Sequence, residues 1–490
     1  MVSRGEGPGV ARRRSLGALT RAAIALTAIT LAACGRAAKP ARAVIVAPPP
    51  TAIEASAEAA PPTPLPRASA AVLACLEPER RDDGAQALPS DAELACREGD
   101  RSACHAVGSA TMAPGCRAVL LRDACDGDVA AACLDLALEP AGDATSTVAL
   151  SRLLARACEL GSGRGCREHA AHLDPGDERH EPLARGCMLG DGASCRLSAA
   201  ATTDDAAAAT SLDSACRHGD ALGCRMLGER HFAGRGVATD AAHGRALLLR
   251  ACMLDDASDG GEACRELAAQ NALFGGQTDA PDRSALLERG CTKGSVDSCR
   301  ALASERYGAG LYEGALGPAA RLAALAPEDW FGPYLHGMSL YNLGRFDEAV
   351  GVLERLCELR SEWPYCKLWL YLARERSARD GKLELARTTA SLDSSAWPGP
   401  VAAFFLGRIS EAVLIGRARR GDGRQQLEQA CEAHYYVGAR HMAHGRAKQA
   451  ARSFELTIAT GVTNFVEYAA ARAELGRLRA GAAQPKAQPP

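Results

Sequence analysis

Cysteine is the residue type whose number and spacing could do chemistry here, since the chain of 490 residues contains 20 of them. Closely spaced cysteines bind metals in reducing compartments and form disulfides in exported proteins. Most of these cysteines form pairs eight positions apart, and one pair contains four extra residues. The pairs are Cys96 with Cys104, Cys125 with Cys133, Cys158 with Cys166, Cys187 with Cys195, Cys216 with Cys224, the longer pair Cys252 with Cys264, and Cys291 with Cys299.

The interval between paired cysteines contains glycine or aspartate in most pairs, and helical patterns such as Ala246–Cys252 flank it. Eight residues of continuous helix would separate two cysteines by about 12 Å, which is too far for a disulfide. A chain reversal at the glycine brings the two helix ends together. The spacing therefore predicts a helix, a tight turn and a second helix, with a disulfide across the turn. Each such bridge would stabilise the fold by about 2–3 kcal/mol.

Some cysteines fall outside this series. Cys357 and Cys366 are nine positions apart across a proline, which predicts a bridge of the same kind. Cys75 and Cys116 either form a longer-range bridge that closes the first repeat or stay unpaired. Cys431 would then be a single thiol, either a small buried apolar residue or a redox or intermolecular site.

The N-terminal segment has the features of an export signal. Five arginines accompany an apolar stretch at 22–33 that is too short to span a bilayer, so residues 1–33 are expected to be a signal peptide. Residues 31–34, Leu-Ala-Ala-Cys, resemble the lipobox of bacterial lipoproteins, which implies cleavage before Cys34 and lipidation of that residue. The alternative is a plain signal peptide with a chance cysteine. Gly35 rather than aspartate follows, which favours the outer membrane. A chain that faces the periplasm is the expectation, and a surface orientation is the alternative that the sequence leaves open.

Composition divides the mature chain into four parts. Residues 34–70 are rich in alanine and proline and are expected to form a semi-extended tether, and 481–490 form a similar disordered tail. Between them lie two repeat regions, the cysteine-rich 71–303 and the cysteine-poor 304–480. No later stretch has the sequence of a membrane span, so we expect the lipid to be the membrane attachment.

The cysteine-rich region resembles Sel1-like repeats, in particular the cysteine-rich subset found in secreted bacterial proteins. The best copy runs from Cys224 to Cys252 and contains Gly-Arg-Gly-Val at 234–237, then Asp240 and a leucine-rich helix. Two other intervals lack the Gly-x-Gly turn, which predicts shorter helices. The resemblance implies antiparallel helix pairs that stack into an α-solenoid.

The region 304–480 resembles tetratricopeptide (TPR) repeats. Trp330, Trp363 and Trp397 recur at intervals of 33 and 34 residues, each near a proline. A turn recurs as well, in which glycine ends one helix and a small alanine lets the next helix cross closely. The positions that fit the TPR consensus are Gly337, Leu340, Gly344, Phe346, Ala349 and Leu353. The predicted fold class is all-α, an α-solenoid of Sel1-like and TPR helix-turn-helix repeats that is disulfide-stapled in its N-terminal half.

Three blocks near the end of the chain are similar, in that order, to the C-terminal half of the new lipoprotein I family of TPR lipoproteins. The blocks begin at Trp397, Glu432 and Asn464. The resemblance implies a non-enzymatic adaptor that brings cell-wall endopeptidases together with a processing protease and with synthesis machinery. The cysteine-rich region has no counterpart in that family.

Motifs of metal or covalent catalysis are missing from the sequence. It has no Cys-x-x-Cys, no His-Glu-x-x-His and no Gly-x-Ser-x-Gly, and none of its six lysines stands three residues after a serine. We therefore predict no metal, no cofactor and no enzymatic activity. Surface or packing roles are assigned to His231, His434, His441 and His444. The formal net charge of −2 provides no field for binding nucleic acid.

These observations predict a lipid-anchored scaffold of the cell envelope that binds partner proteins through its repeats. Peptidoglycan-processing enzymes are the partners that the resemblance suggests. The aromatic residues of 304–480 are candidate anchors for a partner, although the sequence does not assign which of them are exposed. Two alternatives are a Sel1-type protein that binds or hydrolyses β-lactams and a module that binds peptidoglycan directly. The oligomeric state is not predicted.

Overall fold

The computed structural model of the chain describes residues 68–77, 90–111, 113–139, 147–174, 176–254, 259–273 and 282–483. All of them belong to one compact unit, Pro64–Pro490. The predicted signal peptide, Cys34 and the tether up to residue 67 lie outside the described residues. None of the helices in the described ranges combines the length and the apolar character that crossing a membrane requires.

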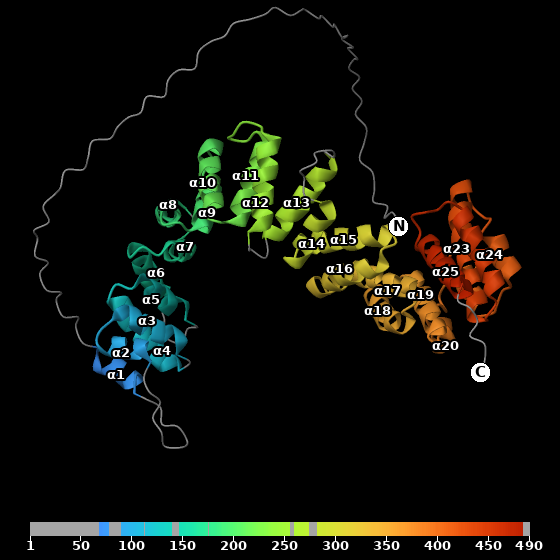
Figure 1. Cartoon of the computed structure of the whole chain (residues 1–490), viewed down its shortest axis with the longest axis horizontal. Coiled ribbons are helices and arrows are strands. Elements are labelled where there is room, and N and C mark those ends of the chain that lie inside the picture. The colour runs from blue at the N-terminus through green and yellow to red at the C-terminus, as the bar shows by residue number, and fades with distance from the viewer. Residues whose placement is uncertain are drawn as a thin grey trace, which may run out of the picture. The chain divides into compact units, whose positions relative to one another are not determined.

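Every regular element in these ranges is a helix (Figure 1). The cysteine-rich region contains α1 (Ala70–Cys75), α2 (Asp91–Arg97), α3 (Arg101–Ala110), α4 (Pro114–Asp126), α5 (Ala130–Leu138), α6 (Thr147–Glu159), α7 (Gly163–His172), the 3-10 helix η1 (Asp177–Arg179), α8 (His180–Met188), α9 (Gly192–Ala201), α10 (Asp205–Arg217), α11 (Ala221–Ala233), α12 (Ala241–Met253), α13 (Asp259–Leu273), α14 (Arg283–Thr292) and α15 (Val296–Gly308).

The C-terminal repeats contain α16 (Tyr312–Leu325), α17 (Phe331–Leu343), α18 (Phe346–Leu359), α19 (Pro364–Arg376), α20 (Lys382–Thr388), α21 (Gly399–Phe405), α22 (Glu411–Arg417), α23 (Gly423–Ala443), α24 (Ala447–Ala459) and α25 (Val466–Ala483). The expected boundary between the two regions, at 303 and 304, falls inside α15, so no linker separates them. Helix α25 enters the segment 481–490 that was expected to be a tail. The predicted fold class, all-α repeats with disulfides in the N-terminal half, is confirmed.

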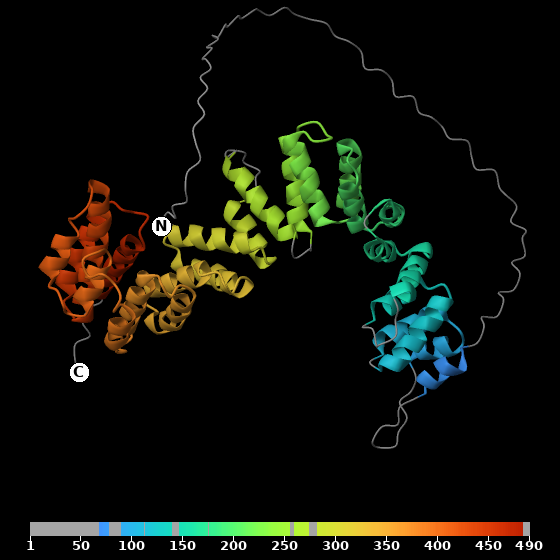
Figure 2. The same ribbon diagram turned by 180° about the vertical axis from the view of Figure 1, so that it is seen from behind.

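Most helices pack mainly against the helix before and the helix after them, whereas α1 packs against α4. Figures 1 and 2 show this from both sides for α11 and α12, which lie side by side. Such packing is typical of repeat proteins, in which one helix pair covers the apolar face of the next pair. Residues that share a site therefore come from neighbouring repeats.

The turn inside a disulfide-bonded helix pair has a recurrent local structure. Gly190 adopts a φ of 87°, in the left-handed region that glycine favours, and Asp191 then caps α9 by accepting a hydrogen bond from Ser194 N at 2.9 Å. Cys195 follows four positions after the cap, which places it opposite Cys187. The glycines with positive φ at the corresponding positions of other repeats are Gly99, Gly161, Gly219 and Gly294.

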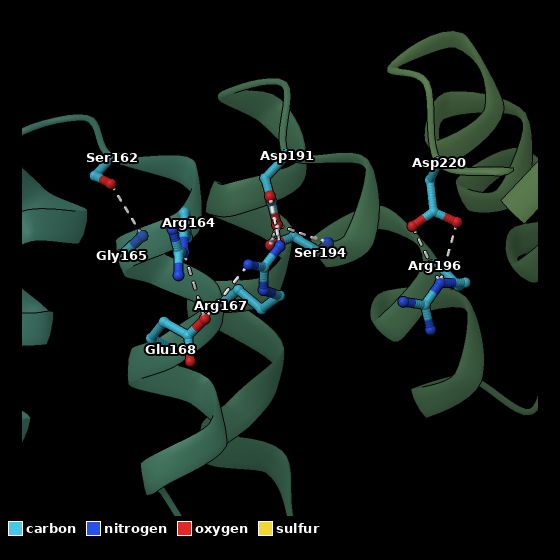
Figure 3. Close-up of polar contacts among 9 residues, drawn as sticks. All are labelled: Ser162, Arg164, Gly165, Arg167, Glu168, Asp191, Ser194, Arg196 and Asp220. Atoms are coloured by element: carbon cyan, nitrogen blue, oxygen red, sulfur yellow. Dashed lines mark hydrogen bonds and ion pairs between the residues drawn. The ribbon is translucent and has the colours of Figure 1, made fainter. Parts of the chain in front are cut away.

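Arginine side chains connect one cysteine-rich repeat to the next. Arg167 Nη1 lies 2.8 Å from Asp191 Oδ1, and Arg196 Nε lies 3.1 Å from Asp220 Oδ1 (Figure 3). Each arginine directly follows the second cysteine of its own pair, and each aspartate is the N-cap of a helix in the following pair. The same aspartate therefore ends a turn within its repeat and pairs with the preceding repeat.

A second set of arginines caps the carboxyl ends of helices. Arg185 Nε donates to the Cys158 carbonyl oxygen at 3.2 Å, and Arg156 Nε donates to the Cys125 carbonyl oxygen at 3.3 Å. Each of these arginines stands two positions before the first cysteine of its own pair. The last carbonyls of a helix have no partner within it, so a charged donor from the next repeat is favourable there.

The core of the C-terminal repeats is aromatic, whereas small and aliphatic side chains fill the core of the cysteine-rich region. Trp369, Tyr435 and Phe454 are buried together, with ring centroids 5.2 Å apart for the first two and 5.7 Å apart for the last two. Helix α25 packs against both α17 and α23. It therefore closes this core with residues that are distant in sequence from their partners.

Candidate functional site

The cysteines that were predicted to form disulfides lie at the turns between paired helices. In the seven close pairs the sulfur atoms are bonded, and the Cα atoms lie 4.4–4.7 Å apart. The bonded partners in these pairs are Cys96 and Cys104, Cys125 and Cys133, Cys158 and Cys166, Cys187 and Cys195, Cys216 and Cys224, Cys252 and Cys264, and Cys291 and Cys299.

Two further disulfides join cysteines outside this series. Cys357 is bonded to Cys366, and Cys75 is bonded to Cys116, with Cα separations of 5.4 and 5.3 Å. The sequence left the second of these links open, and the structure forms it. Because the nucleophile and metal ligand of cysteine is the thiolate, bonded sulfur atoms serve neither role. The paired cysteines are therefore structural in this geometry.

Cys431 is the free cysteine among the described residues, and it lies buried on α23. Burial raises the pKa of its thiol to about 12. The reactive form of cysteine is the thiolate, which is scarcely populated at neutral pH with such a pKa. Of the two roles that the sequence left open, the structure favours a small packing residue.

The histidines singled out in the sequence have local roles. Burial lowers the pKa of both His434 and His441. His444 Nδ1 lies 2.8 Å from a carbonyl oxygen of the preceding turn, and the rings of His231 and His243 pack edge to face at 4.5 Å. Within the part of the chain that the structure describes, no three His, Cys, Asp or Glu side chains form a group suited to a metal ion.

Two small cavities lie in the C-terminal repeats. The larger, of about 330 Å³, is lined by residues of α18, α19 and α20, including Arg374 and Glu384, which form an ion pair with each other. The smaller, of about 170 Å³, lies between α19 and α23, where Glu375, Arg376 and Arg440 mix both charges. Neither set of lining residues contains a nucleophile oriented by a base, so neither cavity supports an acyl-transfer site.

The most distinctive surface is formed by aromatic side chains at the N-terminal ends of α17, α19 and α21. Trp330 and Trp363 are the N-cap residues of α17 and α19, and Trp397 precedes α21. Tyr334 and Tyr365 accompany them, and all five side chains are partly exposed. We call these five residues the aromatic edge.

Four rings of the aromatic edge, those of Trp330, Tyr334, Trp363 and Tyr365, contact one another across the repeats. Trp363 is central: its ring centroid lies 5.9 Å from that of Trp330 and 5.6 Å from that of Tyr334. Its centroid also lies 5.9 Å from that of Tyr365. The Arg360 guanidinium covers the Trp330 ring at 5.0 Å from the centroid. Tryptophan and tyrosine that remain partly exposed in such a cluster are typical anchors of protein interfaces.

Two buried carboxyl groups accept hydrogen bonds from aromatic side chains, and one of them, Glu432, bonds directly to the aromatic edge. Glu432 of α23 accepts hydrogen bonds from Tyr365 Oη at 3.1 Å and from Trp397 Nε1 at 2.8 Å. Glu467 of α25 accepts a hydrogen bond from Tyr436 Oη at 2.9 Å. The two glutamates are only 5% and 3% exposed. Aromatic donors from α19, α23 and the segment before α21 are therefore fixed by acidic side chains.

Both carboxyl groups hold a proton more tightly than an exposed glutamate does. Burial raises the pKa of Glu467 to about 7. Burial and then the nearby charge of Glu467 raise the pKa of Glu432 well above its ordinary value, although the hydrogen bonds from Trp397 and Tyr365 act in the opposite direction. The two groups interact, so their titrations belong to the pair.

Comparisons with known proteins bear on the repeats. No protein-family model matches the chain. It is similar to a protective antigen with an SLR fold from uropathogenic Escherichia coli, with 16% identity, a TM-score of 0.38 and coverage of 81% of this chain and 91% of that one. It is similar to a Sel1 repeat protein from Oxalobacter formigenes, with 14% identity, a TM-score of 0.33 and coverage of 39% of this chain and 85% of that one. It is also similar to the TPR domain of P58(IPK), with 12% identity, a TM-score of 0.25 and coverage of 79% of this chain and 100% of that one.

Sequence reasoning found the three tryptophans of the edge but missed the two glutamates that support it. A signal was present for Glu432, because Tyr435 and Tyr436 follow it at three and four positions and share its helix face. A carboxyl group on an aromatic helix face is unusual and points to a specific partner. For Glu467 the signal is weaker, since no aromatic residue stands three or four positions from it in the sequence.

Proposed function

We propose that this protein is a lipid-anchored scaffold of the cell envelope that binds partner proteins through the aromatic edge. The observation that carries the proposal is the aromatic edge, in which all five side chains remain partly exposed. The rings of Trp330, Tyr334, Trp363 and Tyr365 contact one another, and Trp397 is joined to Tyr365 through Glu432. Burying such rings against a partner would remove apolar surface from water, which favours binding. Tryptophan and tyrosine also lose little side-chain entropy when they are buried.

The cellular setting of this proposal comes from the sequence. The Leu-Ala-Ala-Cys segment at 31–34 supports attachment through a lipid on Cys34, at the outer membrane and facing the periplasm. The resemblance of the last three blocks to the new lipoprotein I family supports peptidoglycan-processing enzymes as partners. In this setting the disulfides would form and persist.

Affinity capture from solubilised envelopes tests the proposal. The full chain and its Trp363→Ala variant would be used as baits, and the proteins retained by each would be identified by mass spectrometry. We expect a defined set of envelope proteins to be retained by the wild type and lost with Trp363→Ala. Leu383→Ala is the matched control, because Leu383 is 82% exposed and lies on α20, outside the aromatic edge.

The same preparation separates the alternative functions. Covalent labelling by a β-lactam probe, or its hydrolysis, would replace the scaffold proposal with a β-lactam-binding or hydrolysing function. Retention on purified sacculi without any protein partner would indicate a peptidoglycan-binding module. For the anchor, Cys34→Ala should abolish lipid labelling and move the protein from the membrane fraction to the soluble fraction.

A further inference from the structure

Three acidic side chains are buried in the described part of the chain, and all three lie in the C-terminal repeats. Glu474 is 1% exposed and contacts the guanidinium groups of Arg376 and Arg477. Glu432 and Glu467 are as deeply buried, yet the donors to their carboxyl groups are a tryptophan and two tyrosines, which are uncharged. A buried charge without a cation is unfavourable, so burial favours the protonated form of Glu432 and Glu467.

In the part of the chain that the structure describes, the groups found to interact with the pair are tyrosines, a thiol and a further carboxylate. The titratable groups that face the pair are Tyr307 of α15, Tyr334 of α17, Tyr365 of α19, and Glu428, Cys431 and Tyr436 of α23. Burial raises the pKa of each of these tyrosines and of the thiol, so they remain neutral near pH 7. Glu428 contributes further negative charge toward Glu432.

The pair joins three structural parts. Glu432 connects α23 to the aromatic edge through Tyr365 and Trp397, which are 67 and 35 positions away in the sequence. Glu467 connects α25 to α23 through Tyr436. Figures 1 and 2 both show α25 beside α23, in agreement with their packing. The two carboxyl groups interact electrostatically. Ionisation of both would place two like charges in a buried space of low dielectric, where they repel.

We propose that Glu432 and Glu467 form a proton-sharing pair that positions Trp397 and Tyr365 in the aromatic edge, and that loss of the last shared proton loosens this arrangement. Glu432 is thus a positioning residue of the binding surface, and Glu467 sets the charge that Glu432 can carry. The inference rests on the proposed function of the edge. Partner binding would be tighter under mildly acidic conditions than under alkaline ones.

The variant Glu467→Gln tests the shared proton. It keeps a carbonyl oxygen that can accept from Tyr436 and removes one of the two charges. The pKa of Glu467 in the folded state is raised to about 7, so the folded state holds this proton more tightly than the unfolded state does. The stabilisation that results is fully present below the ordinary glutamate pKa. It is lost as the pH rises from that value through about 7. The unfolding equilibrium constant of the wild type relative to this variant should therefore rise at least about tenfold between about pH 5 and about pH 8.5.

Two features make this measurement specific. Comparing the wild type with the variant cancels the contributions of His434 and His441, which titrate in both proteins. Glu474→Gln is the control, since it removes a buried carboxylate that already has arginine partners and should leave the dependence on pH in this range unchanged. Parallel pH profiles for the wild type and Glu467→Gln would overturn the proton-sharing proposal.

A second variant, Glu432→Gln, tests positioning without any partner. The amide accepts hydrogen bonds only through its oxygen, because its nitrogen is a donor, so it cannot serve both the Trp397 N–H and the Tyr365 hydroxyl as two carboxyl oxygens do. Hydrogen exchange of the Trp397 indole N–H, measured by NMR, reports on this positioning. We expect faster exchange in the variant than in the wild type. In the wild type we expect faster exchange at about pH 8.5 than at about pH 5, after correction for the intrinsic exchange rate.

The exchange measurement separates the two proposals. An unchanged corrected exchange rate in both cases would overturn the positioning role of Glu432. Capture of partners that fails at every pH while the indole responds would overturn only the proposed function of the edge.

Discussion

Arg289 Nε donates a hydrogen bond to the Cys252 carbonyl oxygen at 3.1 Å, and its Nη2 donates to the Met253 carbonyl oxygen at 3.2 Å. Arg289 belongs to one disulfide-bonded helix pair and Cys252 to the pair before it. The same relationship occurs between Arg321 and Cys291, with a distance of 2.7 Å from Nε to the carbonyl oxygen. The disulfides of the eight-residue series therefore act within helix pairs, while these arginines act between them.

Replacement of this arginine tests its role between repeats. Arg289→Ala should lower the free energy of unfolding by about 1–2 kcal/mol, because two helix-end carbonyls lose a charged donor while water can still reach part of the site. Urea denaturation of the wild type and the variant measures the difference. Arg152→Ala on the exposed face of α6 is the control and should change stability by less than about 0.5 kcal/mol. Equal effects for both variants would mean that the arginine contact contributes little.

Removal of one disulfide tests how much such a bond stabilises its own repeat. The double variant Cys187→Ala with Cys195→Ala opens a loop with a sequence separation of 8 and should lower the free energy of unfolding by about 2.5 kcal/mol on the chain-entropy estimate. Cys431→Ala removes a thiol without opening a loop, and should cost about 1 kcal/mol. Non-reducing peptide mapping should show the remaining pairs unchanged in both variants. Free thiol within those pairs in the wild type would contradict the disulfide assignment.

Glycine substitutions separate backbone conformation from packing. Gly190→Ala should destabilise the fold by about 1 kcal/mol, because a φ of 87° is unfavourable for alanine. Gly351→Ala, in an exposed and uncrowded position of α18, should instead stabilise it by about 0.5–1 kcal/mol, because alanine favours helix more than glycine does. Thermal unfolding of both variants shows whether each is less stable or more stable than the wild type. A loss of stability with Gly351→Ala would indicate an unrecognised role for that surface.

The buried ion pair of α25 provides a contrast with the protonated pair. Glu474→Gln should lower the free energy of unfolding at pH 7 by about 3 kcal/mol, because it leaves the largely buried guanidinium of Arg376 with a neutral partner. Glu467→Gln should be much less harmful at the same pH, because it removes no ion pair. Denaturant unfolding at a single pH ranks the two variants. A larger loss of stability for Glu467→Gln than for Glu474→Gln would contradict the view that Glu474 is ion-paired and Glu467 is not.

Much of the cysteine-rich region could be predicted from the sequence because its determinants are local. Cysteines eight positions apart, such as Cys187 and Cys195, can bond only if the chain reverses between them. The glycine and the N-cap aspartate inside the same interval, Gly190 and Asp191, are the residues that make this reversal. The link from Cys75 to Cys116 remained open, since a sequence separation of 41 imposes no local geometry.

The arginine contacts between repeats were not predicted, although their spacing is regular. The sequence shows an arginine two positions before Cys158, Cys187, Cys252 and Cys291. Arginine at a repeated position could equally face solvent, because its charge and its length allow many conformations. Its partner is a backbone carbonyl, which every residue has, so no residue type marks the contact.

By itself the sequence determined the helical class, the helix-turn-helix unit and the disulfide pairs of short sequence separation, because residues close together along the chain specify turns, caps and short loops. The tertiary structure decided which aromatic side chains share an edge and which carboxyl groups lie behind it. Glu432 meets Tyr365 and Trp397 only because α19, α21 and α23 pack together across 67 and 35 positions. Burial in that packing, rather than residue type, is what gives Glu432 and Glu467 their raised pKa values.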